Sequence, residues 1–315
     1  MIGIMCTHVD DFCFGGNKEF FENIITGIKR RLKIGTEEVS EFKYIGINIE
    51  EREEGVWLEQ NKYIDDINIP ESRDFFGNRE MEGKELTLYR SLVGQMNWIS
   101  CQTRPDLSYY VSERSRYFRG GKVEEMRKVI NILKRAKNMR VGILLGKLKD
   151  RVEIEVFTDA SYGNSIDESP QIGYIVALKD NEGNRSPIVW KSKCVRRVAR
   201  STIEAEAIGL IEGIEAGIFL SECWMEMMGG DRLKVKVYTD SKTLKTAIYS
   251  ETKVLSKNLR IDLAWIKWVL EMDKIEGVEW VTTKCQIADV FTKGRVDSNL
   301  IKEYVEGKRR GERKI

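Results

Sequence analysis

Apolar and polar side chains alternate along residues 152–160, which read Val-Glu-Ile-Glu-Val-Phe-Thr-Asp-Ala. A period of two predicts a strand with one better-buried face, and this strand ends on Asp159 beside small residues that allow a turn. Residues 172–178 and 186–191 flank a turn at 180–184 and predict two further strands. Together these segments predict a three-stranded meander that begins on the strand carrying Asp159.

The segments that follow alternate between helix and strand. Residues 201–228 carry apolar side chains at helical spacing, and 235–240 predict a fourth strand. Later segments predict a helix from 241, an amphipathic helix over 259–270, a fifth strand at 278–281 and a helical start at 288–293. This order predicts an α/β fold in which helices cover the faces of a mixed sheet.

The first 150 residues combine short strands with longer helices. We expect an apolar strand at 1–5, a helix at 17–33, a hairpin from 42–49 and 55–58, a short helix at 60–67, and a helical segment at 86–140 with a break at Pro105. The polar stretch 70–84 predicts a domain boundary.

The helix predicted at 122–140 has one apolar stripe, and its other positions carry seven Lys or Arg residues against two glutamates. Two interpretations remain open at this point. The basic positions are either the solvated face of a packed helix or a surface that tracks phosphates.

Composition narrows the class of protein. With 42% hydrophobic and 32% charged residues, the chain is typical of a soluble globular protein and not of a disordered one. The net charge is only +2, so any nucleic-acid affinity must come from local basic patches. No apolar run reaches 18 residues, and we therefore expect no membrane partner.

Cysteine and histidine usage excludes several kinds of site. The six cysteines are widely spaced and form no CxxC pair, which favours free thiols over a disulfide framework or a zinc site. The single histidine, His8, argues against a histidine-based metal site or a Ser-His relay.

Four carboxylates fall at comparable positions in the second half of the chain: Asp159 ends the first strand, Glu206 lies early in the long helix, Asp240 ends the fourth strand, and Asp289 opens the last helix. One such acid alone usually caps a turn or faces solvent. Converging on one sheet edge, four would repel each other unless cations lay between them. Two Mg²⁺ ions about 4 Å apart would neutralise them and support in-line phosphodiester hydrolysis.

Several longer phrases surround these acids. They are Thr158-Asp159-Ala160-Ser161-Tyr162, Trp190-Lys191-Ser192-Lys193, Ser201-Thr202-Ile203-Glu204-Ala205-Glu206, Tyr238-Thr239-Asp240-Ser241 and Gln286-Ile287-Ala288-Asp289-Val290-Phe291-Thr292-Lys293. In this order and spacing they resemble the ribonuclease H domain of Copia-type (Ty1/copia) LTR retrotransposon Pol polyproteins. The resemblance implies a ribonuclease H-like mixed five-stranded sheet with flanking helices. It also implies a catalytic, metal-binding set of Asp159, Glu206, Asp240 and Asp289, holding two Mg²⁺ ions that Mn²⁺ can replace.

The motif contains two glutamates, and the family pattern favours one. In ribonuclease H folds the metal-binding glutamate precedes an apolar pair and a small residue, which favours Glu206 over Glu204. The chain departs from the family at Ala207, where a tyrosine is usual, and at Ala264, where a histidine is frequent. These departures concern substrate contacts or packing, so they bear on efficiency more than on the metal ligands.

Hydroxyl and basic side chains near the acids are candidate nucleic-acid contacts. They are Thr158, Ser161, Lys191, Lys193, Arg196, Arg197, Arg200 and Ser241. The alternatives are that the hydroxyls cap turns and that the basic residues form a solvated loop.

The first half resembles the end of a Copia-type reverse transcriptase. The phrases His8-Val9-Asp10-Asp11-Phe12, Tyr44-Ile45-Gly46-Ile47-Asn48-Ile49, Tyr89-Arg90-Ser91-Leu92-Val93-Gly94-Gln95 and Thr103-Arg104-Pro105-Asp106-Leu107 follow in family order. The resemblance makes Asp10 and Asp11 a vestigial polymerase metal site, with His8 in place of the usual tyrosine. We expect the fragment to lack the strand bearing the first polymerase aspartate and therefore to be inactive as a polymerase alone.

The resemblance predicts a C-terminal Pol fragment in four parts: a partial reverse-transcriptase palm at 1–84, a helical thumb or connection at 85–150, a ribonuclease H-like domain at 151–294 and a basic, disordered tail at 295–315. The predicted function is two-metal endonucleolytic cleavage of the RNA strand of RNA/DNA hybrids. Its expected partners are that hybrid and the N-terminal part of the polyprotein, in cytoplasmic virus-like particles or the nucleus. The alternative is a degenerate or co-opted remnant that binds nucleic acid without cutting it.

Overall fold

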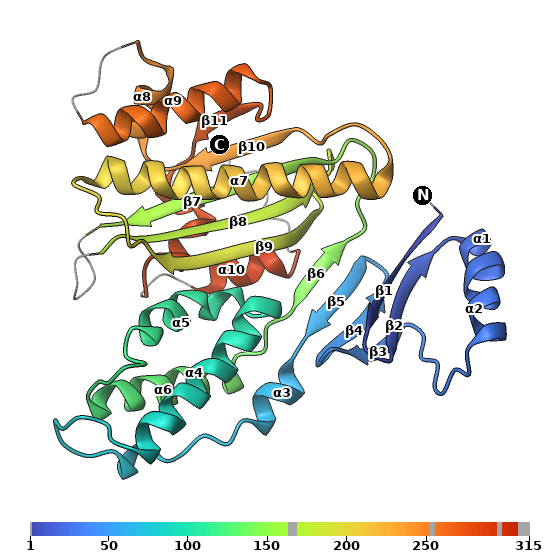
Figure 1. The fold of residues 1–315 in the computed structure, drawn as a ribbon, viewed down its shortest axis with the longest axis horizontal. Coiled ribbons are helices and arrows are strands. Elements are labelled where there is room, and N and C mark those ends of the chain that lie inside the picture. Colours follow the sequence, from blue (N-terminus) through green and yellow to red (C-terminus); the bar gives the residue numbers. More distant parts are fainter. Residues whose placement is uncertain (1, 163–168, 252–255, 295–297, 308–315) are drawn as a thin grey trace.

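A five-stranded mixed sheet forms the centre of the computed structural model, which describes residues 2–162, 169–251, 256–294 and 298–307 (Figure 1). Its strands are β7 (Glu153–Ser161), β8 (Gln171–Lys179), β9 (Arg185–Cys194), β10 (Val235–Thr239) and β11 (Gly277–Trp280). The order is β11-β10-β7-β8-β9, with β7 to β9 antiparallel and β10 and β11 parallel to β7. The predicted mixed α/β sheet of five strands is confirmed.

Helices cover both faces of this sheet. The long helix α7 (Thr202–Met228) packs with α8 (Lys242–Tyr249) and α9 (Lys257–Glu271) against the face that carries Ile154 and Val156. A Cβ at Gly213 would lie 2.4 Å from Cγ2 of Thr158, so the absence of a side chain lets α7 approach β7 closely. This approach brings the first turns of α7 over the end of β7.

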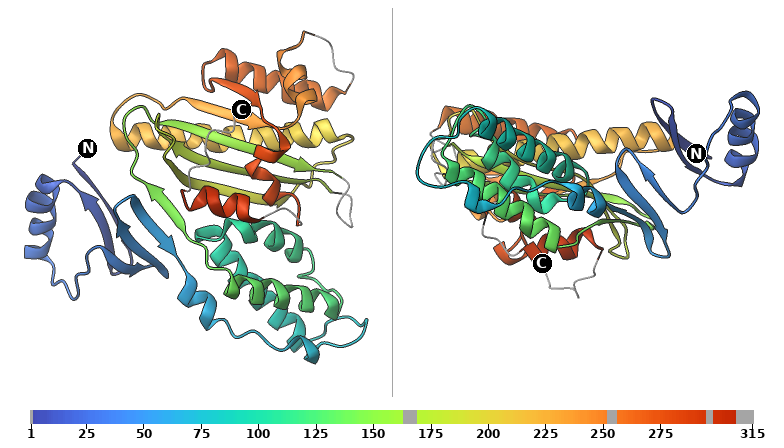
Figure 2. Two further views of the ribbon diagram at one scale, coloured as in Figure 1. Left: turned by 180° about the vertical axis from the view of Figure 1, so that it is seen from behind. Right: turned by 90° about the horizontal axis from the view of Figure 1, so that it is seen from below.

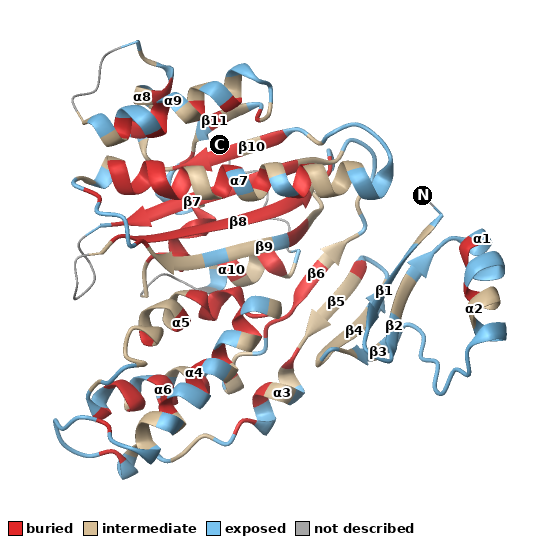
Figure 3. Cartoon of the chain, in the orientation of Figure 1, coloured by how far each residue is buried: buried red, intermediate tan, exposed pale blue. Residues whose placement is uncertain are grey.

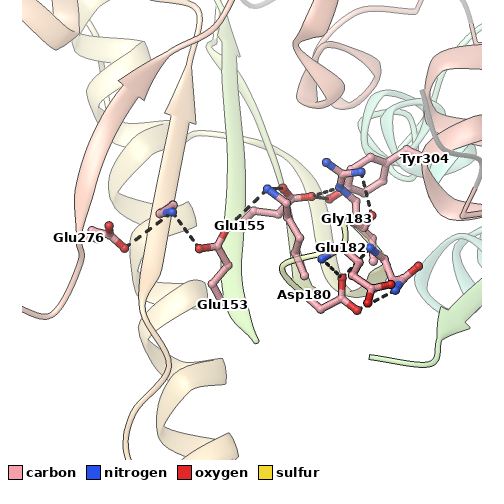
Figure 4. Close-up of polar contacts among 11 residues, drawn as sticks. Glu153, Glu155, Asp180, Glu182, Gly183, Glu276 and Tyr304 are labelled. Carbon is pink, nitrogen blue, oxygen red and sulfur yellow. Dashed lines mark hydrogen bonds and ion pairs between the residues drawn. The ribbon is translucent and has the colours of Figure 1, made fainter. Parts of the chain in front are cut away.

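The opposite face is covered by α10 (Ser298–Val305), the last helix among the described residues. Ile301 and Val305 are fully buried there, and the Tyr304 hydroxyl donates a 2.7 Å hydrogen bond to the buried Glu155 carboxylate (Figure 4). The Arg185 guanidinium pairs with the same carboxylate at 2.5 Å. The expected disordered tail at 295–315 is therefore wrong for 298–307, because apolar side chains at helical spacing anchor that segment. Residues 295–297 and 308–315 lie outside the described residues.

The N-terminal residues form a hairpin backed by a helix. The hairpin joins β1 (Gly3–His8) to β2 (Asp11–Gly16), and α1 (Lys18–Phe20), the π-helical turn η1 (Phe21–Ile25) and α2 (Thr26–Arg31) follow. Figure 2 shows this unit at one end of the molecule, away from the central sheet. Its strands are largely exposed, whereas buried residues concentrate in the central sheet and the helical segment (Figure 3).

A second, four-stranded sheet links the hairpin region to the centre. Its strands are β3 (Glu41–Tyr44), β4 (Ile47–Arg52), β5 (Gly55–Glu59) and β6 (Ile143–Gly146), all antiparallel. The sequence predicted a hairpin from 42–49 and 55–58. The β4–β5 hairpin is present, but a turn at 45–46 divides the expected strand 42–49 into β3 and β4. The sequence missed β6, which is only four residues long. A Cβ at Gly55 of β5 would lie 2.1 Å from the Leu145 carbonyl of β6. A side chain at that position of β5 would therefore block the pairing of the two strands.

The helical segment has its own core. It contains α3 (Asn61–Asp66), η2 (Ser72–Asp74), α4 (Lys84–Gln102), η3 (Pro105–Leu107), α5 (Ser108–Ser115) and α6 (Val123–Asn138). The predicted break at Pro105 is confirmed. The fully buried Arg104 guanidinium makes a bidentate 2.8 Å contact with Asp106 and donates to the Ala136 carbonyl at 3.1 Å, which ties the break to α6.

The basic residues of α6 are largely engaged within the protein. Lys134 of α6 pairs with Glu71 at 3.2 Å, and Arg140, just after the helix, pairs with Asp65 at 3.0 Å. Lys137 donates to the carbonyl of Asp65, within α3, and to that of the residue just after the helix, each at 2.8 Å. These contacts favour a packed helix with a solvated face over a surface that tracks phosphates.

Polar contacts join the helical segment to the edge of the central sheet. Trp190 Nε1 donates to the Ser100 carbonyl at 2.7 Å, and the Tyr110 hydroxyl donates to the Gly294 carbonyl at 2.7 Å. The assignment of residues 1–150 to a reverse-transcriptase palm and thumb stays a prediction. Within the described ranges, no helix is both long and apolar enough to cross a membrane.

Candidate metal centre

Three carboxylates converge at one edge of the central sheet. Asp159, Glu206 and Asp240 each offer one oxygen, and these atoms lie within 4.8 Å of one another. β7 and β10 are parallel neighbours, so Asp159 near the end of one strand and Asp240 just after the other meet at the same edge. Asp159 and Glu206 are buried, and Asp240 is half-buried. The structure thus brings together three of the four acids that the sequence singled out.

Asp289 lies at the same edge but contacts a lysine. It belongs to the short 3₁₀ helix η5 (Ile287–Phe291), and its Oδ1 is 2.8 Å from Lys293 Nζ. The same ammonium lies 3.4 Å from Asp159 Oδ2. Lys293 therefore neutralises Asp159 and Asp289 together. Sequence reasoning missed this role although Lys293 follows Asp289 by four residues, the spacing at which helical side chains meet.

Burial and mutual repulsion shift the ionisation of these acids. Burial, reinforced by the charges of Asp289 and Asp240 and opposed by Lys293 and Thr292, raises the pKa of Asp159 to about 7. Burial, and then the charges of Asp159 and Asp240, raises the pKa of Glu206 well above its usual range. Burial is the larger cause of both shifts, and the repulsion between neighbouring carboxylates adds to it.

For the ammonium of Lys293, burial and the neighbouring charges act on the pKa in opposite directions. Burial acts to lower the pKa of its ammonium, but the charges of Asp159 and Asp289 outweigh that effect and raise it. The lysine is therefore held in its charged form beside the acids. A positive charge is thus already part of the protein's own arrangement at this edge.

A divalent cation suits this donor set. Mg²⁺ prefers carboxylate oxygens and is usually held by one or two of them with water in the remaining positions. Asp159, Glu206 and Asp240 supply three such oxygens, and the half-buried Asp240 leaves one side of the group open to solvent. The excess negative charge gives a bound cation a strong electrostatic role.

The segment after β11 orients Asp159. Thr292 Oγ1 donates a hydrogen bond to Asp159 Oδ2. Gln286 Nε2 donates to the Thr158 carbonyl at 2.9 Å, which fastens the segment to β7. The Phe291 side chain fills the space above Gly173, where a Cβ would lie 2.2 Å from it. The sheet and η5 thus position Asp159 and Asp289 relative to each other.

Asp240 is oriented by residues around β11. Thr283 Oγ1 donates to Asp240 Oδ2 at 3.0 Å, and Trp280 Nε1 donates to the Asp240 carbonyl at 3.0 Å. The Lys242 ammonium lies 4.2 Å above the Trp280 ring, a cation–π contact on the exposed side of the site.

Glu204 and Glu206 have different roles in the structure. Glu204 accepts hydrogen bonds from the Arg200 backbone N–H at 2.7 Å and from the Ser256 hydroxyl. Its own N–H donates to Ser201 Oγ, which caps α7. The Ser256 hydrogen bond lowers the pKa of Glu204. Glu204 thus stabilises the helix start, and Glu206 joins the acidic group.

The hydroxyl residues predicted to contact nucleic acid are mostly structural here. The Thr158 side chain is only 1% exposed, and its hydroxyl donates to the Tyr238 carbonyl at 3.5 Å, so a direct contact with a nucleic acid is excluded in this structure. Ser241 caps α8 by accepting from the Leu244 N–H at 3.3 Å. Ser161 is buried at the end of β7.

Two of the basic candidates are engaged in ion pairs. Lys193 pairs with Glu212 at 2.5 Å, and Arg197 makes a bidentate 2.9 Å contact with the buried Asp262. Lys191 is exposed on β9 and remains a candidate for phosphate contact, as do the exposed Arg196 and Arg200. The predicted patch therefore divides into residues that hold the fold and residues that face solvent.

Asp10 and Asp11 lie far from this centre in the fold. Asp10 is in the two-residue turn of the N-terminal hairpin, Asp11 begins β2, and both are exposed. Among the described residues, no group of three or more potential metal ligands within reach of one another includes either of them.

Comparison with known proteins gives relatives of one kind. No family model matches the chain. It is 28% identical over 222 residues to the retrovirus-related Pol polyprotein from transposon RE1 of Arabidopsis thaliana, covering 64% of this chain and 14% of that polyprotein. It is 25% identical over 277 residues to the Pol polyprotein from transposon TNT 1-94 of Nicotiana tabacum, covering 79% of this chain and 20% of that polyprotein.

The chain thus spans no more than a fifth of either relative. The curated homologues are Pol polyproteins of Ty1/copia-type retrotransposons, which confirms the resemblance seen in the motifs. Among solved structures, RNase H1 from Halobacterium salinarum NRC-1 aligns at 17% identity and a TM-score of 0.33, covering 44% of this chain and 93% of that one.

Proposed function

We propose that residues 151–294 form a metal-dependent ribonuclease H that hydrolyses the RNA strand of RNA/DNA hybrids. The observation that carries the proposal is the convergence of Asp159, Glu206 and Asp240 at one sheet edge. Homology to retrotransposon Pol polyproteins supports it. In the same proposal, residues 1–84 and 85–150 are remnants of a reverse-transcriptase palm and thumb.

Asp159, Glu206 and Asp240 would hold the divalent ions, and Asp289 would be a fourth ligand. When bound at these carboxylates, the ions would activate water and neutralise the charge that develops on the leaving 3′ oxygen. Asp159 would link the metal ligands to Lys293, because its carboxylate lies within 4.8 Å of those of Glu206 and Asp240 and 3.4 Å from the lysine ammonium. Thr292 keeps its carboxylate in that orientation.

Burial makes this arrangement effective. Charges in a water-poor site interact more strongly than charges at the surface, and Asp159 and Glu206 are both buried. Asp240 is the most exposed of the three acids, so the scissile phosphate would enter on its side. A minor-groove contact to 2′-hydroxyls would select the RNA strand.

Asp10 and Asp11 would contribute no polymerase activity in this chain. A polymerase site needs a third acid to hold its metals and the nucleotide, and none of the described residues supplies one beside this pair. We therefore assign the proposed chemistry to the central sheet alone.

The test is cleavage of an RNA/DNA hybrid, end-labelled on the RNA strand, by the full chain in Mg²⁺ or Mn²⁺. Duplex RNA and duplex DNA of the same sequence serve as substrate controls. We expect cuts in the RNA of the hybrid only, and their loss in Asp159→Asn but not in the matched surface variant Asp231→Asn. Hybrid binding without cleavage would instead support the nucleic-acid-binding remnant. Cleavage that persists in Asp159→Asn would refute the proposed site.

A further inference from the structure

Two cysteines stand directly opposite each other in the N-terminal hairpin. Cys6 of β1 and Cys13 of β2 are register partners in the antiparallel pair. Opposite residues in such a pair have Cα atoms about 4.5–5.5 Å apart and side chains on the same face. Disulfides form at Cα separations of about 4.4–6.8 Å. The backbone therefore holds these two thiols at a separation that a disulfide can bridge.

The two thiols are also accessible. Cys6 is exposed, Cys13 is half-buried, and both are free. The helix that backs the hairpin lies on the other face, where the Phe20 ring sits over Gly3 and Gly16. Cys6 and Cys13 occupy the alternate positions of each strand and so point away from that helix.

Electrostatics agrees with this proximity. Burial, and then the charge of Cys6, raises the pKa of the Cys13 thiol. Burial, and then the charges of Cys13, Cys6 and Asp11, raises the pKa of the Tyr44 hydroxyl. The Cys6 sulfur is thus close enough to Cys13 for its charge to act on the Cys13 thiol.

We propose that Cys6 and Cys13 are a redox-sensitive pair that closes to a reversible disulfide when the chain meets hydrogen peroxide. The more exposed Cys6 thiolate attacks the peroxide; the O–O bond breaks, a sulfenic acid forms on Cys6, and hydroxide takes up a proton to leave as water. The Cys13 sulfur then attacks the Cys6 sulfur, the S–O bond breaks, and a second water leaves with the Cys13 proton. Two thiols and one peroxide thus give one disulfide and two waters.

The disulfide would order the turn that joins the two strands. Val9 in that turn has a φ of 53°, a left-handed conformation that is costly for a β-branched residue. Two-residue hairpin turns with a positive φ at the first central position usually place Gly there, so the reduced turn is prone to open. The disulfide would lie two residues along each strand from the His8–Asp11 pair that closes the turn. It would therefore hold Asp10 and Asp11 in place. This inference is independent of the proposed ribonuclease.

The chain allows a direct test. The first lysine or arginine is Lys18, so trypsin releases Cys6 and Cys13 in one peptide, residues 1–18. The full reduced chain is treated with hydrogen peroxide, alkylated with N-ethylmaleimide, digested and analysed by mass spectrometry. We expect this peptide to carry no N-ethylmaleimide and to be lighter than the reduced, unlabelled peptide by two hydrogen atoms. When dithiothreitol precedes alkylation, the peptide should carry two labels.

Cys101 provides an internal control because it is exposed and lies on helix α4, where no cysteine faces it across a strand pair. A peptide that stays doubly labelled at peroxide doses that oxidise Cys101 would overturn the proposal. In Cys13→Ser, dimedone should trap a sulfenic acid on Cys6 and the two-hydrogen loss should vanish. Amide exchange at residues 9–12 should slow in the oxidised chain; an unchanged rate would overturn the proposed effect on the turn.

Discussion

Lys293 places its ammonium 3.4 Å from the buried Asp159 carboxylate, the central acid of the candidate site. It also pairs with Asp289 at 2.8 Å, so one lysine compensates two acids. A divalent cation that bound between these acids would compete with Lys293 for the same oxygens. The lysine therefore sets both the stability of the metal-free protein and the free-energy gain on metal binding.

Lys293→Met tests this competition. Because the lysine side chain is 38% exposed, solvent screens part of the loss, and we expect the metal-free variant to be less stable by about 1–2 kcal/mol. Mg²⁺ should raise the Tm of the variant more than that of the parent chain. Thermal unfolding with EDTA and with Mg²⁺ measures both effects. Lys293→Arg, which keeps the charge, is the control; equal Mg²⁺ shifts in the Met variant and the parent would contradict the competition.

The raised pKa of Asp159 predicts a pH-dependent stability for the metal-free chain. The folded pKa, about 7, lies above the ordinary value of 3.8, so the protonated acid favours folding. That contribution is complete below pH 4 and is lost as the pH rises to about 7, with an upper limit of about 4 kcal/mol.

Urea unfolding in EDTA at pH 5 and pH 8 measures this loss. The parent chain should lose more stability between the two values than Asp159→Asn, which cannot ionise at that position. Mg²⁺ affinity should fall as the pH drops below 7, because protons compete for the same carboxylate. Parallel pH profiles for the parent and Asp159→Asn would show that Asp159 does not titrate in this range.

Glu204 and Glu206, both in the first turns of α7, should respond differently to mutation. Glu206→Gln removes a ligand and a repelling charge, so we expect loss of Mg²⁺ binding with little loss of stability. Glu204→Gln weakens hydrogen bonds to Arg200 and Ser256 at the helix start, so we expect a cost of about 1 kcal/mol with binding retained. Titration calorimetry and urea unfolding give the two readouts. The reverse pattern would make Glu204 the ligand.

The phenol of Tyr304 should stabilise the chain measurably. Its hydroxyl donates to Glu155, which is 1% exposed, so Tyr304→Phe leaves part of a buried carboxylate without its donor. We expect a loss of about 1–3 kcal/mol in the free energy of unfolding. Tyr162→Phe removes an exposed hydroxyl and is the matched control. Equal stability of the two variants would show that α10 is held by its apolar residues alone.

Much of the site could be predicted because its parts are local in sequence. Asp159 and Asp240 end strands whose alternation is visible, and parallel strands bring such ends together. The central sheet was predictable for the same reason. The sequence could not show in which direction each side chain points or what it contacts. Thr158 is next to Asp159 in the chain, yet its side chain points under α7, because neighbours in a strand face opposite sides.

The elements and contacts that the sequence analysis missed were missed for physical reasons. Strand β6 and helix α10 are short and gain their stability from distant partners: β6 pairs with β5, and α10 packs on the sheet through Ile301 and Val305. Local patterning is weak in such elements, and the charged residues near the end of the chain obscured the apolar ones. Lys293 was missed because a lysine beside acids is common, and only the fold shows that it reaches two of them.

Among the basic residues on and after β9, some should contribute to the stability of the fold and others to nucleic-acid binding. Arg197→Ala leaves the buried Asp262 without its partner, and since the arginine is 43% exposed we expect a loss of about 1–3 kcal/mol in stability. Lys191 is exposed, so Lys191→Ala should leave the fold intact and weaken hybrid binding in a salt-dependent way. A lost phosphate contact should reduce the slope of log affinity against log salt by about 1. Fluorescence anisotropy with a labelled hybrid, in the non-cleaving Asp159→Asn background, measures that slope. An unchanged slope in Lys191→Ala would place the phosphate contacts elsewhere, with Arg196 and Arg200 as the next exposed candidates.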